Sequence, residues 1–302
     1  MRWQVVAAIL LGVHPAIAQT DSPSGKCASC AVWNTPQTPF RVFGNTYYVG
    51  TRELSAVLIT SKEGHILLDG ALPDSAPQIV QNIRALGFDP KQIKLIVNSH
   101  AHFDHAGGIA ALQQLSGATV AASPSSAAVL RRGVPSQDDP QRDLDPPSMT
   151  KIRDVRVLRD GQALRIGTST ITAHFTGGHT PGGTSWSWKS CEQLRCLNIV
   201  YADSLTAVSA DTYRFTSHPK LLEKFYKSFA VLEVIPCDIL LSAHPGFSGT
   251  MRKLQDRESG HQPDAFVDQH SCRDYVSNAR EGLTKRIASE NAVVDGGRDA
   301  NR

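Results

Sequence analysis

The order of hydrophobic and polar residues along the chain predicts a succession of strands and helices. Short runs rich in β-branched residues are typical of buried strands, and apolar residues at helical spacing are typical of amphipathic helices. In the first half of the chain, strands are expected at 40–43, 46–49, 55–60, 65–68, 94–99 and 119–122. The first four are separated only by short turns, which indicates an antiparallel meander.

Helices are expected between the later strands of this group. The segments 73–86 and 125–132 carry apolar residues at helical spacing. A third helix is expected after the strand at 94–99, with Ile109 and Leu112 on one face. Strands that alternate with helices in this way are the signature of an α/β fold.

A long loop separates these elements from a second group of strands. Residues 133–150 lack periodicity and hold four prolines. A loop of this length in a compact domain is usually functional or disordered, and we expect it to cover a substrate. The strands after it are expected at 155–158, 163–166, 169–175, 184–188, 198–201 and 238–242, with a helix at 218–232.

The two ends of the chain have their own patterns. A basic residue, the apolar stretch Val5–Val13 and Ala16-Ile17-Ala18 predict a signal peptide at 1–18 and export to the periplasm. The rest, 19–302, is expected to form one domain, with 19–37 as a polar extension across its surface. No other stretch reaches about 18 consecutive apolar residues, so no membrane-spanning helix is expected.

The C-terminal tail, from residue 258, is expected to contain a helical stretch that ends near Ala288. Its last dozen residues are polar and are expected to be disordered.

Charge argues against nucleic acid as a partner. The formal net charge is +3, and the chain has neither a long basic run nor a stretch in which aromatic residues alternate with basic ones.

All six cysteines lie beyond the predicted signal peptide, and an oxidising compartment favours disulfides. Three pairs are expected: Cys27–Cys30 and Cys191–Cys196, which are close in the sequence, and Cys237–Cys272, which would tie the C-terminal tail to the strand at 238–242. The first is a C-x-x-C, which could instead be redox-active or bind zinc. No second C-x-x-C accompanies it, and this favours a local disulfide. Spacing alone does not fix the connectivity.

The strongest chemical signal is a cluster of histidines after the strand at 94–99. The chain has 11 histidines, yet three of them fall within 100–105. His100 and His102 lie two apart on extended backbone, so they point the same way and can share one ion. Asp104 stands where a helix could start, and its carboxylate is expected to serve as both cap and ligand. So many imidazole and carboxylate donors in one turn of chain predict a metal site.

Two further histidines follow later strands. His179 lies in the glycine-rich stretch 177–183, a tight loop in which backbone can approach an ion closely. We take it as the third ligand beside His100 and His102. His244 follows the last strand. With the remaining donors of the first cluster, this makes two sites of three protein ligands, the number that leaves a position open.

Asp69 also ends a strand, and two roles fit it equally well. It would either cap the turn or accept a hydrogen bond from a histidine that binds metal.

Four motifs in this chain resemble those of the metallo-β-lactamase superfamily and, within it, the third subclass of class B β-lactamases. They are His100-x-His102-x-Asp104-His105, Gly178-His179-Thr180-x-Gly182-Gly183, Tyr201–Thr206 and His244-Pro245. The subclass rests on Ser204, which stands where the first subclass has a cysteine ligand. The resemblance spans 39–275 and implies a four-layer αββα sandwich, in which two mixed β-sheets are flanked by helices.

The resemblance also implies the residues of the site. Two zinc ions are expected, one on His100, His102 and His179, the other on Asp104, His105 and His244. Asp104 and His179 are counted as catalytic. Substrate contacts are expected from Ser204, Thr206 and Gln141. The pairing of Cys237 with Cys272 is likewise a feature of relatives.

The implied activity is zinc-dependent hydrolysis of β-lactam antibiotics by a monomeric enzyme, which would confer resistance to penicillins, cephalosporins and carbapenems. Hydroxide generated at the metals would open the ring without a serine nucleophile. The rivals are other superfamily hydrolases: thioesterases, lactonases and phosphodiesterases. These use a bridging aspartate near the position of Asp203, so a bridging Asp203 would weaken the β-lactamase interpretation. A non-catalytic zinc-binding protein would need its open coordination position blocked, and nothing in the sequence suggests that.

Overall fold

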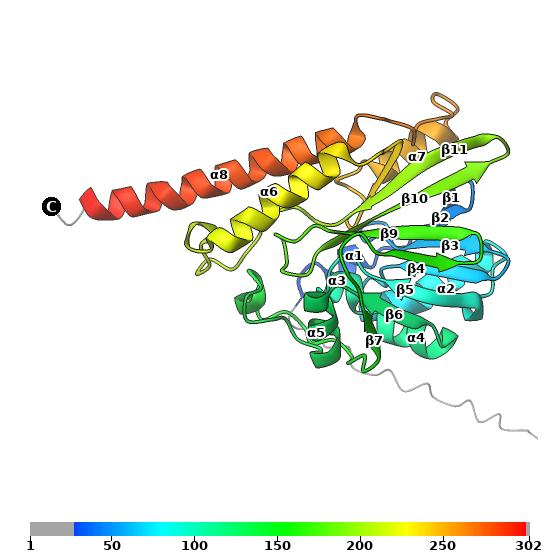
Figure 1. Cartoon of the computed structure of the whole chain (residues 1–302), viewed down its shortest axis with the longest axis horizontal. Helices are drawn as coiled ribbons and strands as arrows, with labels where there is room; N and C mark the ends of the chain where they lie inside the picture. Colours follow the sequence, from blue (N-terminus) through cyan, green and yellow to red (C-terminus); the bar gives the residue numbers. More distant parts are fainter. Residues whose placement is uncertain (1–26, 300–302) are drawn as a thin grey trace, which may run out of the picture.

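The structure is a computed structural model that describes residues 27–299, and the side chains of residues 27–292; it contains two β-sheets packed face to face (Figure 1). The larger sheet has the strand order β1-β2-β3-β4-β5-β6-β7. Its first four strands pair antiparallel, and β4 to β7 pair in parallel. The strands are β1 Phe40–Phe43, β2 Thr46–Tyr48, β3 Val57–Ser61, β4 Gly64–Leu68, β5 Ile93–Val97, β6 Thr119–Ala122 and β7 Val155–Val157.

The smaller sheet has the order β12-β11-β10-β9-β8. Only β11 and β12 are parallel in it, so both sheets are mixed, as the sequence predicts. Its strands are β8 Ala163–Ile166, β9 Ser169–Phe175, β10 Thr184–Glu192, β11 Arg195–Ala202 and β12 Ile239–Ser242.

Helices cover the outer face of each sheet, which completes the four layers (Figure 1). The α-helices are α1 Cys30–Trp33, α2 Ala76–Ala85, α3 Phe103–Ala106, α4 Ile109–Ser116, α5 Pro124–Arg132, α6 Pro219–Val234, α7 Thr250–Glu258 and α8 Ser271–Asp299. The short 3-10 helices are η2 Pro73–Ser75, η3 Pro90–Gln92, η4 Arg142–Leu144 and η5 Phe215–Ser217. Side chains of α2, α4 and α5 pack on the larger sheet, and those of α6 and α8 pack on the smaller one. The predicted αββα sandwich is confirmed.

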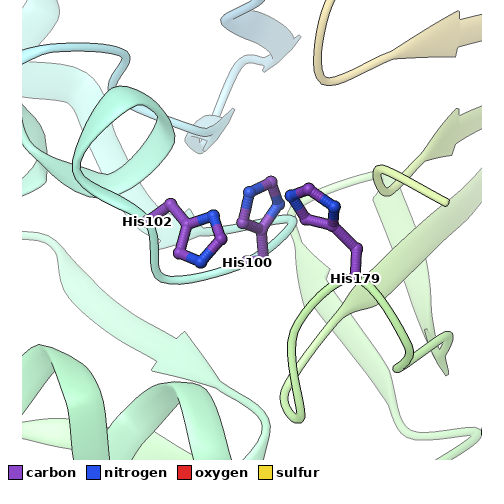
Figure 2. Close-up of side chains that lie close together, drawn as sticks. All are labelled: His100, His102 and His179. Carbon is purple, nitrogen blue, oxygen red and sulfur yellow. The ribbon is translucent and has the colours of Figure 1, made fainter. Parts of the chain in front are cut away.

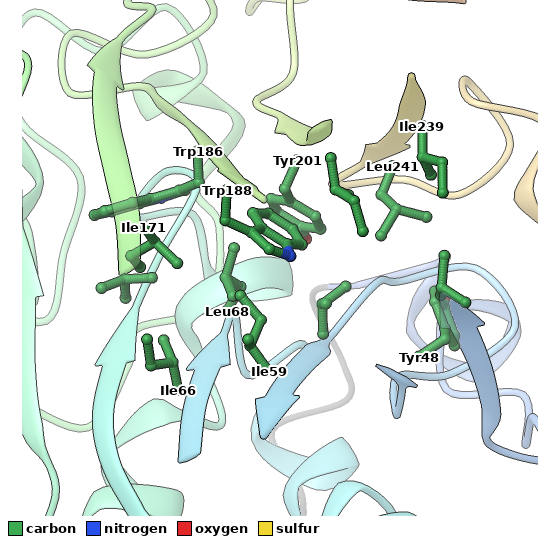
Figure 3. Close-up of a cluster of buried hydrophobic side chains, with 14 of the residues drawn as sticks. Tyr48, Ile59, Ile66, Leu68, Ile171, Trp186, Trp188, Tyr201, Ile239 and Leu241 are labelled. Carbon is green, nitrogen blue, oxygen red and sulfur yellow. The ribbon is translucent and has the colours of Figure 1, made fainter. Parts of the chain in front are cut away.

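The main core lies between the two sheets (Figure 3). Trp186 and Trp188 of β10 both point into it, against residues such as Ile59 and Leu68 of the larger sheet. Their alternation with Ser185 and Ser187 in the sequence therefore marks the core-facing side of β10. The Trp186 indole donates to the Asn98 carbonyl at 3.0 Å, so this core residue also fixes the chain just after β5.

Three features differ from the expectations for the ends of the chain. The helix expected to end near Ala288 continues, because α8 reaches Asp299. Pairs spaced i, i+4 on its surface, such as Glu281 with Lys285, stabilise an exposed helix of this kind. α7 has no counterpart in the sequence analysis. Of the predicted extension at 19–37, the structure describes 27–37, and this part is not only a surface segment, because Cys30 and Trp33 pack against the core that includes residues of α2 and α4.

Three disulfides join the six cysteines in the expected pairs, Cys27–Cys30, Cys191–Cys196 and Cys237–Cys272. The second closes the hairpin of β10 and β11, and the third ties the start of α8 to the segment before β12. Within residues 27–299, none of the helices is long and apolar enough to span a membrane. The predicted signal peptide, 1–18, lies outside the described residues.

Candidate metal centre

The six predicted metal ligands meet at one edge of the sandwich. Four of them follow β5 in the larger sheet. His179 follows β9 and His244 follows β12, both in the smaller sheet. Because the two sheets are stacked, these strand ends bring donors from distant parts of the chain together. Figure 2 shows His100, His102 and His179 converging from the two sides.

The first group consists of His100, His102 and His179, called the first trio below. All three side chains are buried, and one donor atom from each lies within 4.8 Å of the others. His100 Nε2 is buried without a hydrogen-bond partner among the described residues. An unpaired buried nitrogen is costly, and an ion would satisfy it. Three neutral imidazoles with one open position are typical of a catalytic zinc site, so the residues present fit zinc.

Each histidine of the first trio is held through its other ring nitrogen. His100 Nδ1 lies 2.8 Å from Asp203 Oδ1, and His102 Nε2 lies 3.0 Å from Asp139 Oδ2. His179 Nδ1 lies 2.8 Å from a backbone carbonyl, that of Thr206. Partners of this kind fix the orientation and tautomer of a metal-binding imidazole.

The position of Asp203 answers the question that the sequence leaves open. Its Oδ1 contacts the outer nitrogen of His100, and its Oδ2 packs closely against Gly183, where a side chain would collide with it. Burial, and then the charge of Asp69, raise the pKa of Asp203 well above its ordinary value. The carboxyl therefore supports His100 from behind and does not lie between the two groups of ligands.

Asp104, His105 and His244 form the second trio. Asp104 Oδ2 lies 3.2 Å from His105 Nε2 and 3.5 Å from His244 Nε2, and the two imidazole nitrogens are 3.2 Å apart. Donors of His100, Asp104 and His105 also lie within 4.8 Å of one another, so the two trios are contiguous. A carboxylate with two imidazoles is a second donor set that suits zinc.

The outer contacts of the second trio are longer. His105 Nδ1 is 3.9 Å from Asp69 Oδ2, and His244 Nδ1 is 3.3 Å from the Glu53 carbonyl. Asp69 makes shorter hydrogen bonds elsewhere: it accepts from the Ser99 backbone at 2.6 Å and from the Tyr201 hydroxyl at 2.7 Å. Asp69 therefore links the ends of β5 and β11, which is neither the turn cap nor the close histidine acceptor that the sequence offered as its two roles.

Electrostatics differ between the trios. Burial lowers the pKa of His179 to about 3, and burial with the neighbouring histidines lowers that of His100 well below its ordinary value. Burial alone would lower the pKa of His105 too, but Asp104 beside it raises it. Burial alone would raise the pKa of Asp104, yet His105 and His244 hold it well below its ordinary value. The centre thus presents the neutral imidazoles of His100 and His179 on one side and the ionised carboxylate of Asp104 on the other.

The prediction that Asp104 caps a helix is wrong. α3 begins at Phe103 with His102 in the N-cap position, so Asp104 lies inside the first turn. Its carboxylate faces the two histidines of its trio and not the helix end. The turn fits because Gly107 and Gly108 pack against Pro73 and the Gly70 carbonyl, where a side chain would collide.

The structure places the three predicted substrate contacts differently. Gln141, in the loop 133–150, has its Nε2 3.1 Å from His179 Nε2 and so lies over the first trio. Thr206 is half-buried, and both its carbonyl and its hydroxyl contact His179 Nδ1. Ser204 is buried, and its hydroxyl has no hydrogen-bond partner in the part of the chain that the structure describes.

A cavity of about 200 Å³ adjoins the centre. Its walls come from the loop 133–150, from His102 to Asp104 and from the N-terminal segment around Trp33. The Trp33 ring centroid is 5.8 Å from that of His244. The loop 133–150 therefore lies beside the site, as its predicted role as a cover requires.

Sequence reasoning missed two residues of this site, Asp139 and Trp33. Asp139 stands in an acidic, proline-rich loop, outside the motifs that contain the predicted ligands. Nothing in the sequence therefore connects it with them. Trp33 lies beside a C-x-x-C, and that motif drew attention to cysteine chemistry only.

Comparison with known proteins gives a consistent result. Residues 49–192 match the family described as the metallo-beta-lactamase superfamily. Similar solved structures include Rm3 metallo-beta-lactamase, which is 51% identical to this chain. The match covers 88% of this chain and 99% of the Rm3 chain, with a TM-score of 0.85. MEM-A1, a subclass B3 metallo-beta-lactamase from a soil metagenome library, is 49% identical, with coverage of 86% and 99% and a TM-score of 0.83.

One curated relative is named for a different hydrolase activity. The N-acyl homoserine lactonase AttM of Agrobacterium fabrum (strain C58 / ATCC 33970) is 28% identical over 151 residues, which is 43% of this chain. The match covers 57% of the length of that protein, so this chain spans little more than half of it.

Proposed function

Since this chain belongs to the metallo-beta-lactamase superfamily and is a hydrolase, we propose that it opens the β-lactam ring of antibiotics with two zinc ions in the periplasm. We further propose a broad spectrum of substrates that includes penicillins, cephalosporins and carbapenems, and that hydrolysis confers resistance. The observation that carries the proposal is the pair of contiguous trios, with Asp203 behind His100 and not between them.

The residues present would hold the ions as two groups of three, the first and second trios. Bound zinc would supply a Lewis acid and a nucleophile at neutral pH. The chain's own residues keep the donors in the correct protonation state: the low pKa of His179 leaves it neutral, and that of Asp104 leaves it ionised.

Substrate positioning is assigned to the rim of the centre. Gln141 presents an amide donor above the first trio, and the loop that carries it forms one wall of the cavity beside the centre. Thr206 lies at the other side of His179. Among the described residues, the Ser204 hydroxyl has no hydrogen-bond partner and so no base to activate it, which argues against a serine nucleophile and agrees with attack by water.

The direct test uses purified mature protein with a carbapenem, a cephalosporin and a penicillin, each with and without a chelator. Loss of the ring chromophore that stops with chelation and returns with added zinc is the expected result. Asp104→Ala should abolish turnover while the protein stays folded, because the sheets and disulfides do not depend on that carboxylate. Retained turnover in this variant would refute the second trio as a zinc site.

Lactone hydrolysis is the second candidate, favoured by the match to the homoserine lactonase. An N-acyl homoserine lactone in the same assay separates the two. Turnover of the lactone with no loss of any β-lactam would replace the proposal by this alternative.

A further inference from the structure

We propose that Glu290 and Arg286 of α8 are positioning residues that hold the loop 133–150 over the metal centre. They act through the segment 209–216, which lies between α8 and that loop. The kinetic part of this proposal rests on the proposed β-lactam hydrolysis, whereas its structural part does not.

Glu290 is a buried carboxylate that binds backbone of the 209–216 segment. Its side chain is 6% exposed. Oε1 accepts from the Phe215 backbone at 3.0 Å, and Oε2 accepts from the Thr216 backbone and hydroxyl, each at 2.9 Å. Hydrogen bonds to an ionised acceptor are stronger than neutral ones, so this residue fixes η5 against α8.

Arg286, one helical turn earlier, holds the other end of the same segment. Its Nε donates to Glu290 Oε1 at 2.8 Å. Its Nη2 donates to the Ser209 hydroxyl at 2.7 Å and to the Tyr213 carbonyl at 2.9 Å. The guanidinium also lies 5.4 Å from the centre of the Phe215 ring. The pair therefore anchors the segment at both ends.

The segment in turn contacts the loop that covers the metal centre. The Ala210 backbone donates to the Pro140 carbonyl at 3.0 Å. Pro140 lies between Asp139, which contacts His102, and Gln141, which contacts His179. A shift of this one peptide would move both side chains relative to the first trio.

Tyr213 of the segment lies in the electrostatic field of acidic groups from the loop and from α8. Burial raises its pKa to about 12, and the negative charges of Asp138 and Asp139 in the loop and of Glu290 in α8 contribute.

The helix itself does not need these two residues to stay in place. The Cys237–Cys272 disulfide ties its first turn, and Val276 and Leu283 pack in the core beneath it. Substitution of Glu290 should therefore free the 209–216 segment while α8 remains docked.

The experiment compares Glu290→Gln with Glu281→Gln in the full-length mature protein. Glu281 lies on the same helix but is exposed and pairs only with Lys285 among the described contacts. Amide hydrogen exchange is measured for residues 133–150 and 209–216 in both variants and in wild type. Kinetic constants for a β-lactam and the zinc content are measured alongside.

For Glu290→Gln we expect exchange in both segments to be about 3- to 10-fold faster and KM to rise by a similar factor, with kcat within about 2-fold and zinc content unchanged. Glu281→Gln should match wild type. Arg286→Met, which keeps Glu290 and its bonds to backbone, should give the same pattern if Glu290→Gln folds poorly.

Faster exchange in 209–216 without a change in 133–150 would overturn the proposal, and so would an unchanged KM in an active enzyme. If wild type hydrolyses no β-lactam but Glu290→Gln still loosens both segments, the proposed function fails and the positioning role stands.

Discussion

The ligands of the two trios differ in their outer hydrogen-bond partners and in their burial. His100 and His102 of the first trio are backed by carboxylates at 2.8 and 3.0 Å, and both are buried. In the second trio the nearest carboxylate behind His105 is 3.9 Å away, and the side chain of His244 is 25% exposed. Outer partners fix a ligand before the ion arrives, so the first trio is preorganised and the second can adjust. The first trio should therefore hold its ion more tightly.

Among the variants that compare the two trios, removal of His100 should have the largest effect, because its donor lies close to both trios. His100→Ala is expected to lower kcat/KM by at least about 10³-fold, since bound metal supplies several kcal/mol of transition-state stabilisation. Zinc analysis after dialysis should show clearly less than one zinc per chain, because the first ion is lost and the second trio holds its own ion more weakly. His244→Ala should retain one zinc per chain. If both variants kept the same zinc content, the difference between the trios would disappear.

Asp139 tests the outer support of the first trio. Asp139→Asn should weaken the affinity of one zinc ion about 10- to 100-fold, because an amide is a poorer acceptor behind His102 than a carboxylate. Competition with a chromophoric chelator measures this affinity. Glu53→Gln is the matched control in the second trio. Of Glu53, only the backbone carbonyl contacts His244, so this change should leave both affinities at their wild-type values.

In zinc-free protein the two trios should affect the pH dependence of the free energy of unfolding differently. The pKa of His179 is lowered from 6.5 to about 3, so the unfolded chain binds a proton in this interval that the folded one does not. Stability should therefore fall as the pH drops below 6.5, and His179→Gln should reduce that slope by up to about 1.4 kcal/mol per pH unit.

His105 should change the pH dependence of stability in the opposite direction. Its pKa is raised above 6.5, so its contribution to stability is present below 6.5 and lost as the pH rises through the raised value. His105→Gln should therefore destabilise the zinc-free protein more in acid than in base. Urea unfolding across this range measures both variants, and slopes of the same sign would contradict the assignment.

Thr206→Val should have the smallest effect. It removes a hydroxyl 3.1 Å from His179 Nδ1 but leaves the Thr206 carbonyl at 2.8 Å. Activity should fall by less than about 3-fold, because one good acceptor for that nitrogen remains. A loss of 100-fold or more would mean that the hydroxyl contacts substrate directly, as predicted from the sequence resemblance.

The sequence is informative where chemistry and spacing coincide. His100, His102 and His179 stand at strand ends, which can be predicted from the hydrophobic pattern. The structure brings these three histidines together as predicted. Asp139 could not be found in this way, because its position depends on how a loop without periodicity folds back over the strands. The capping role expected of Asp104 failed because sequence does not fix a helix start to one residue.

The same limit applies to the fold. The strands and most of the helices follow from their apolar patterns. The extent of α8 does not, because a helix with so polar a surface owes its length to pairs between neighbouring turns and to its docking on α6.

The ligands of each proposed ion have one further consequence. In each trio one histidine, His179 or His244, follows a strand of the smaller sheet, and the other two ligands follow β5 of the larger sheet. Each ion would therefore cross-link the two sheets. By mass action, a protein that binds an ion only when folded is more stable when the ion is plentiful. Zinc starvation would then remove the activity and also make the protein more susceptible to proteases. The supply of the metal would thus set the amount of protein that remains.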